Sequence, residues 1–381
     1  MDQLELVIFG VLVAIAALAV LARVLEVPYP ILLVLGGLAL GFVPGIPRIE
    51  LAPELVLLIF LPPLLYGAAF FTSLRDLRAN LRPITLNAVG LVVVTMLVVG
   101  VVGHFVVGLP WPVAFVLGAI VSPTDPVAPA TTLRELRAPR RLVTVIEGES
   151  LANDWTALVL YRIAIAAVLS GTFSLWEAGG RFLLTGIGGL AVGLLVGFVI
   201  RAVRRRIDDP PTEITISILS GYAAYLPAEG LGLSGVVAAV TVGIYMGWHT
   251  PELTTPIMRI QGVSVWEILT FLVNAVLFLL IGLQMPGVLD DLSGRSAAAL
   301  LGWAAAVSAA VIVVRLAWMF TVTYVIRLLD RRPRQVDRRA SWRQRHGRRL
   351  VGDAGRRVAR GRARDSAGDR PGASPSRSAI S

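Results

Sequence analysis

The chain has 381 residues, of which 56% are hydrophobic and only 16% are charged, so it is too apolar for a soluble globular protein and too long for a single membrane anchor. It contains no cysteine, which excludes disulfides and thiolate metal sites. The formal net charge of +10 could suit nucleic acid, but 16 of the 35 arginines lie from Arg331 onward, so the rest is nearly neutral and no nucleic-acid partner is expected. These totals predict an all-α polytopic protein of the lipid bilayer.

The apolar residues form eleven segments. The first has no positively charged region before it, so it is interpreted as a spanning helix and not as a cleaved signal. The segments cover about residues 5–24, 29–45, 53–71, 84–108, 112–135, 143–169, 182–203, 211–226, 231–247, 256–283 and 297–327.

The arginines between these segments predict the orientation. If the N-terminus lies outside, 14 arginines fall on the cytoplasmic side and only three, Arg48, Arg181 and Arg295, on the other. Cytoplasmic loops of membrane proteins carry such an excess of arginine and lysine. About eleven spans with the N-terminus outside and the C-terminus in the cytoplasm are therefore expected.

The fifth segment is interrupted by Pro123, Pro126 and Pro129. Each proline removes a backbone donor and clashes with the preceding turn, so the helix should open near residues 122–126, where Asp125 lies. Open backbone at membrane depth is tolerated where it lines a cavity, and in transporters it marks ion sites. The alternative is a proline kink with a capping aspartate.

The sixth segment carries a polar strip. At 100° per residue, Ser150 and Asp154 share one helix face with Glu147 close by, and Glu149 and Asn153 form a neighbouring stripe. The remainder of the segment is apolar. Acids at membrane depth are costly and are typical of functional sites, so this strip is expected to face the bundle interior.

The polar atoms of these two segments suit a hard monovalent cation. Asp154, Ser150, Thr124 and backbone carbonyls near Pro123 offer only oxygen, which sodium and lithium prefer. Burial raises the proton affinity of an aspartate, so a proton and a cation can compete for one carboxylate. No nucleophile–base pattern is visible, so no enzyme and no cofactor beyond the transported ions are expected.

The motifs resemble one family. TDP at Thr124–Pro126 and EGESLANDWTALVLY at Glu147–Tyr161 are similar to segments of the monovalent cation:proton antiporter-1 family of sodium/proton exchangers, in particular its bacterial branch. Further similar segments are FLPPLLYGAAF, Phe60–Phe70; GLSGVVAAVTVGIYMG, Gly232–Gly247; and WEILTFLVNAVLFLLIGLQM, Trp266–Met285. The resemblance extends to about residue 330.

The resemblance implies roles for single residues. Asp154 would carry the ion and the proton, with Asn153 as its neighbour, Thr124 and Asp125 contributed by the unwound helix, and Ser150 as a ligand. The Asn-Asp pair implies electroneutral exchange of sodium, or of lithium or potassium, for protons across the bacterial plasma membrane. The family fold implies two inverted repeats, a homodimer and alternating access.

The chain departs from the family pattern in two places. Gly67 stands where some relatives place a glutamate that helps to hold the ion. Residues 331–381 form an Arg-rich tail without the family's last two helices and without the G-x-R-G motif whose arginine pairs with the glutamate corresponding to Glu149. Residues 1–330 would then be the exchanger domain, with its second repeat incomplete. The tail is either an out-of-frame end or a regulatory segment, and a transport-deficient protein is the alternative function.

Two further charges lie inside apolar segments. At roughly 1.5 Å per residue from the cytoplasmic ends, Glu267 lies about 15 Å deep and Arg315 about 18 Å deep. Equal depth permits a structural ion pair between Glu267 and Arg315 that supports the site, and the alternative is a direct role of these residues in transport.

Overall fold

The structure is a computed structural model that describes residues 3–43, 53–124, 140–170, 175–292, 294 and 296–329. Every regular element within these ranges is a helix. The chain divides into two compact units, Met1–Leu316 and Ala317–Ser381, and only residues 317–329 of the second are described. The packing and the sites described below lie in the first unit. The predicted tail, 331–381, falls outside the described residues.

Each of the eleven predicted apolar segments overlaps a helix or a run of helices, and the fifth, about 112–135, is described only as far as residue 124. The fourth is a continuous run of α and π turns that follows the short α4. The elements are α1 Gln3–Val24, α2 Tyr29–Gly41, α3 Pro53–Phe70, α4 Leu74–Ala79, α5 Leu81–Thr85, η1 Leu86–Leu91, α6 Val92–Val102, η2 Gly103–Val107, α7 Trp111–Val121, α9 Arg140–Ser170, α10 Leu175–Arg204, α11 Pro210–Gly230, α12 Gly235–Leu253, α13 Pro256–Asp291 and α14 Ala297–Leu329.

Helix length and composition agree with a membrane protein. Among the described residues, five helical runs are long and apolar enough to cross a bilayer, and four shorter apolar helices accompany them. The five runs are Leu81–Val107, Leu142–Ser170, Ala178–Arg204, Pro256–Asp290 and Ala297–Thr321. The membrane class is therefore confirmed, while the number of spans, their orientation and the inverted repeat stay predictions.

Several helices start at polar caps that the local sequence supplies. The side chains of Asp209, Ser234 and Thr255 accept hydrogen bonds from the backbone N–H three residues on, at 3.1, 3.2 and 3.3 Å. Such caps satisfy donors that the first helical turn leaves open. Proline at the first turn of α11 and α13 fits the same positions, because its missing N–H would have no partner there.

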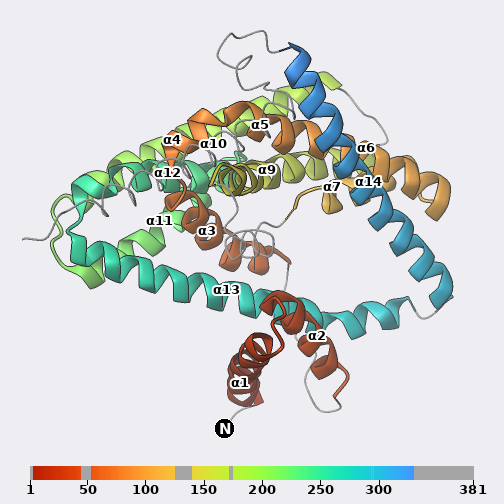
Figure 1. The fold of residues 1–381 in the computed structure, drawn as a ribbon, viewed down its shortest axis with the longest axis horizontal. Helices are drawn as coiled ribbons and strands as arrows, with labels where there is room; N and C mark the ends of the chain where they lie inside the picture. The colour runs from red at the N-terminus through yellow and green to blue at the C-terminus, as the bar shows by residue number, and fades with distance from the viewer. Residues whose placement is uncertain are drawn as a thin grey trace, which may run out of the picture. The chain divides into compact units, whose positions relative to one another are not determined.

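The helices of the first unit pack in three sets. The first joins η1, α6, α7 and α9; the second joins α3, α10, α11 and α12; the third joins α2 to α13. Figure 1 shows α10 beside α12, and α2 crossing α13. At this crossing Gly37 and Gly282 face each other, and a Cβ on either would strike backbone of the opposite helix. These two glycines allow the close approach.

Candidate functional site

The predicted break in the fifth segment begins where the prolines indicated. Helix α7 ends at Val121, and Pro123 and Thr124 follow in non-helical conformation. The Ser122 hydroxyl turns back to donate to the carbonyl of Ala119 at 3.0 Å. Thr124, three residues beyond the end of α7, is half-buried. Asp125 and the rest of the predicted unwound segment lie outside the described residues.

Helix α9 buries most of its predicted polar strip. Glu149, Ser150 and Asn153 are only 3%, 8% and 1% exposed, and Asp154 is half-buried. Helices α7 and η1 pack against this part of α9. The strip therefore faces protein rather than lipid, as its residue types required.

The end of α7 and the α9 strip are joined by the Asn153 side chain. Asn153 Nδ2 lies 3.3 Å from both the backbone oxygen and Oγ1 of Thr124. Turning the carboxamide over would place Oδ1 against the Thr124 carbonyl, acceptor against acceptor, so this orientation is the favourable one. Among the described residues, the buried Asn153 Oδ1 has no donor. An acceptor buried without a donor is costly unless a ligand, such as a cation or a water molecule, occupies it.

Near Asn153, the carboxylate of Glu149 accepts three hydrogen bonds. Its Oε1 accepts from Thr124 Oγ1 at 3.4 Å and from Arg315 Nη2 at 2.9 Å, and its Oε2 accepts from Asn87 Nδ2 at 3.0 Å. The guanidinium balances the buried carboxylate, and the two neutral donors occupy further lone pairs. Glu149 therefore has a cationic partner despite the absence of the G-x-R-G motif.

The predicted pair of Glu267 with Arg315 is wrong. Arg315 binds Glu149 instead, and Glu267 is exposed with no ion pair among the described residues. Trp266 is 2% exposed and points into the helix bundle. Glu267 follows it by 100° around α13 and points away. The predicted depths of the two residues were equal, but Glu267 is exposed on its helix and Arg315 pairs with another acid.

Gly67 lies tightly against Trp266, so a longer side chain at this position would require the indole to shift. A Cβ placed on Gly67 would lie 3.0 and 3.1 Å from two ring carbons of Trp266, and 3.8 Å from Thr270 Oγ1. The indole therefore occupies the position into which a longer side chain would extend.

Asn87 was missed as a candidate. Its signal in the sequence is a single carboxamide in the apolar fourth segment, LNAVGLVVV. Such a residue is costly at membrane depth without a partner, which was a reason to search for one.

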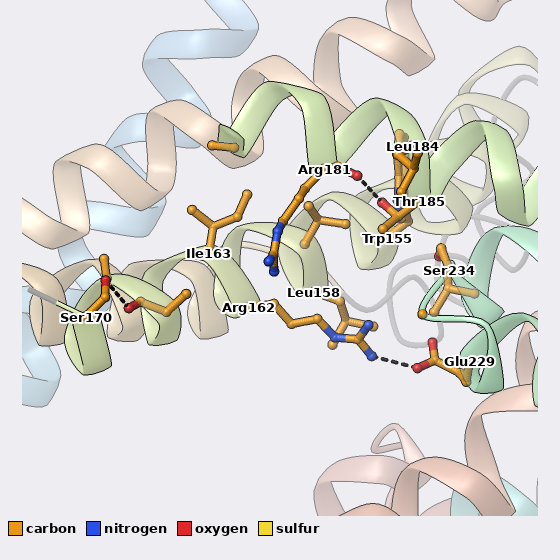
Figure 2. A pocket seen from close by; sticks show the side chains of 16 residues that line it. Trp155, Leu158, Arg162, Ile163, Ser170, Arg181, Leu184, Thr185, Glu229 and Ser234 are labelled. Carbon is orange, nitrogen blue, oxygen red and sulfur yellow. Dashed lines mark hydrogen bonds and ion pairs between the residues drawn. The ribbon is translucent and has the colours of Figure 1, made fainter. Parts of the chain in front are cut away.

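A cavity of about 630 Å³ lies beside the site, between α9, α10 and the α11–α12 turn. Figure 2 shows Arg162 and Arg181 in this cavity and Trp155 at its wall. Arg162 Nη2 pairs with Glu229 Oε2 at 2.7 Å, which joins α9 to the end of α11. Trp155 directly follows Asp154 and its ring contacts that of Phe182, with centroids 4.1 Å apart. The cavity therefore reaches the helical turn of α9 that carries Asp154.

The described residues hold no cluster of three or more His, Asp or Glu that could bind a metal ion as a resident cofactor. The oxygen atoms near Asn153 belong instead to hydroxyls, a carboxamide, the backbone and single carboxylates. This donor set suits a weakly held monovalent ion.

Comparisons with known proteins agree with this geometry. Residues 10–347 match the family model described as sodium/hydrogen exchanger, transmembrane, and the match ends inside the predicted tail. An uncharacterised Na⁺/H⁺ exchanger of Mycobacterium tuberculosis is 39% identical over 350 residues, covering 89% of this chain and 64% of that protein. The low-affinity Na⁺/H⁺ antiporter NhaS1 of Synechocystis is 37% identical over 324 residues, covering 84% and 60%.

The fold is also similar to a solved structure. The sodium proton antiporter MjNhaP1 from Methanocaldococcus jannaschii at pH 8 superposes with a TM-score of 0.59 at 22% identity, covering 84% of this chain and 87% of that one. The chain spans somewhat less than two thirds of the length of the curated relatives it matches first. By the extent of the family match, this chain belongs to the transmembrane sodium/hydrogen exchanger family.

Proposed function

We propose that this chain is a secondary antiporter that exchanges sodium, or lithium or potassium, for protons across the bacterial plasma membrane. Its relatives carry the names of exchangers and antiporters for these ions. The observation that carries the proposal is the buried Asn153 Oδ1, an acceptor without a donor beside the oxygens of Thr124. A cation is a ligand that satisfies an orphaned acceptor and gains from nearby carboxylates.

The proposed carrier is Asp154. In its charged form it would hold the cation together with oxygens of Asn153, Thr124 and Ser150, with Asp125 contributing from the segment after α7. When a proton binds Asp154 the cation loses its charged ligand and leaves, so the two ions take turns. Asn153 carries no charge, and one carboxylate then exchanges one monovalent cation for one proton. Exchange would be electroneutral.

Glu149 is proposed as a support and not as a second carrier. Its charge is balanced by Arg315, and three donors occupy its oxygens. Exposed Glu267 would take no part. Residues 1–330 would form the exchanger domain, working by alternating access in a homodimer, and residues 331–381 would form a cytoplasmic tail.

A second candidate is a transport-deficient protein of the same family. It is favoured by the absence of the G-x-R-G motif from residues 331–381. The Arg315 contact weakens this candidate, because Glu149 is not left as an uncompensated buried charge.

The test is cation-induced dequenching of a pH-sensitive dye in everted vesicles from a strain without its own antiporters. Sodium should restore fluorescence with the wild-type chain, and Asp154→Asn should give none, because an amide does not exchange a proton. Ser296→Ala, at an exposed position before α14, is the matched control and should behave as wild type. Full activity of Asp154→Asn would refute the proposed carrier. A silent wild type that is present and folded would favour the transport-deficient alternative.

A further inference from the structure

Asn87 is a buried carboxamide in a helix that is otherwise apolar at this level. It is 8% exposed and lies in the π-helical turn η1, which interrupts the run between α5 and α6. An unbonded carboxamide would be costly here, so its placement needs a partner. A π turn inserts an extra residue and shifts the register of the side chains, and such turns are frequent at functional sites.

Helix α9 approaches this turn closely. Gly148 packs on Ile84, at the end of α5 just before the turn: a Cβ on Gly148 would come 2.6 Å from Ile84 Cδ1. The short Asn87 side chain then reaches the neighbouring Glu149, with Nδ2 3.0 Å from Oε2. The contact joins two buried groups that lie 62 residues apart in the chain.

The two oxygens of Glu149 have different partners. Oε2 receives Asn87, while Oε1 receives Arg315 and Thr124. Arg315 supplies the balancing charge, and its long side chain is 34% exposed. Asn87 adds no charge and comes from a rigid helix, so its contribution is to fix the rotation of the carboxylate. With Oε2 held, Oε1 is directed toward Thr124.

Thr124 in turn sets the orientation of Asn153. Its Oγ1 donates to Glu149 and accepts from Asn153 Nδ2, and its backbone oxygen accepts from the same nitrogen. One chain of hydrogen bonds therefore runs from Asn87 through Glu149 and Thr124 to Asn153. At its end lies the Oδ1 atom that has no donor.

We infer that Asn87 is a positioning residue for cation binding: through Glu149 it fixes the oxygens of Thr124 and Asn153, and so sets the affinity for the cation and the preference between sodium and lithium. This inference rests on the proposed function. Asn87 does not touch the ion. Its effect is on the distance between the ligand oxygens, to which ions of different radius respond differently.

The test compares Asn87→Leu, nearly equal in size but without a donor, and Asn87→Ala with the wild type in everted vesicles. We expect the sodium concentration for half-maximal dequenching to rise about tenfold, the effect of losing a hydrogen bond to a charged group. The maximal response should persist, and the ratio of the half-maximal concentrations for lithium and sodium should change.

The matched control is Thr95→Val on α6. Thr95 is 3% exposed, so the substitution also removes a buried polar atom from the same helical run, but Thr95 makes no described contact with the site. It should leave both half-maximal concentrations and their ratio unchanged, whatever it does to stability. Folding of each variant is checked by its elution and thermal midpoint in detergent.

The outcomes separate the inference from the proposed function. A folded but inactive wild type contradicts the function itself. An active wild type with an unchanged lithium-to-sodium ratio in folded Asn87→Leu or Asn87→Ala overturns only the role of Asn87. Loss of folded protein in both variants would also overturn it, because Asn87 would then serve the stability of the fold.

Discussion

Among the described residues, two ion pairs contain a buried carboxylate, and they differ in which neighbouring polar atoms lack a hydrogen-bond partner. Glu149 and Arg315 lie at the broken end of α7, whereas Arg204 and Glu213 join the end of α10 to the start of α11, with side chains only 1% and 6% exposed. Beside the first pair the orphaned atom is an acceptor, Asn153 Oδ1; beside the second the orphaned atoms are donors, the Nε and Nη1 of Arg204. An orphaned acceptor can receive a cation, and an orphaned donor cannot.

Around the second pair, side-chain hydrogen bonds join neighbouring helices, beside a cavity of about 240 Å³ that Arg204, Glu213 and Trp266 line. Ser217 Oγ accepts from Trp266 Nε1 at 3.2 Å and lies 3.3 Å from the Tyr66 hydroxyl, so α3, α11 and α13 are tied together by side chains that satisfy one another. No helix is interrupted there among these elements. A buried charge pair alone therefore does not identify a transport site. The proposed site rests instead on the interrupted helix and on the buried acceptor that has no donor.

The largest effect is expected from Arg315→Met. It leaves the buried Glu149 carboxylate without a cation, which costs about 3 kcal/mol and should abolish transport. The measurements are the thermal midpoint in detergent and dye dequenching in vesicles. The double variant Glu149→Gln, Arg315→Met removes both charges and should recover stability without recovering transport. Transport by Arg315→Met at the wild-type level would show that the two pairs do not differ in the way described.

A scaffold role for the second pair predicts a smaller effect on transport. Arg204→Met alone should lower stability, because it leaves Glu213 as a buried charge without a partner. The double variant Arg204→Met, Glu213→Gln should keep the sodium dependence of transport within about twofold of wild type, because joint replacement of a buried pair is often neutral. Vesicle dequenching at several sodium concentrations measures this. Loss of transport in a stable double variant would place the second pair in the transport machinery.

The smallest perturbation tests the cavity beside Asp154. Because the chain has no cysteine, a single introduced one is the only thiol. Ala166→Cys, at the cavity wall, should react with a membrane-impermeant thiol reagent while transport stays unchanged, because the substitution adds one atom at an exposed position. Ala275→Cys, at a position that is 0% exposed, should not react. Equal labelling of both would show that the cavity is not a distinct water-accessible space.

Part of the site could be predicted from the sequence, because it depends on local chemistry. Pro123 and Pro126 forbid a regular helix, and α7 ends just before them. The polar strip of α9 follows from residue type and helical period, and Glu149 and Asn153 share a stripe that faces Thr124. The helices that overlap the predicted apolar segments followed from hydropathy in the same way.

The contacts between helices could not be predicted, because they depend on rotation and register. The sequence did not distinguish Glu149 from Glu267 as the partner of Arg315. The packed structure shows that Arg315 contacts Glu149. Asn87 reaches Glu149 through a π turn whose extra residue has no clear sequence signal. The pairing of Arg162 with Glu229 likewise joins residues 67 positions apart.

The central claim, that cation and proton compete for Asp154, is tested most directly by proton release from the purified full-length chain. Sodium is added to weakly buffered protein in detergent while a pH indicator follows the solution. About one proton should be released per sodium ion bound, because the cation requires the deprotonated ligand. Asp154→Asn should release none. Saturable sodium binding to the wild type without proton release would contradict the account.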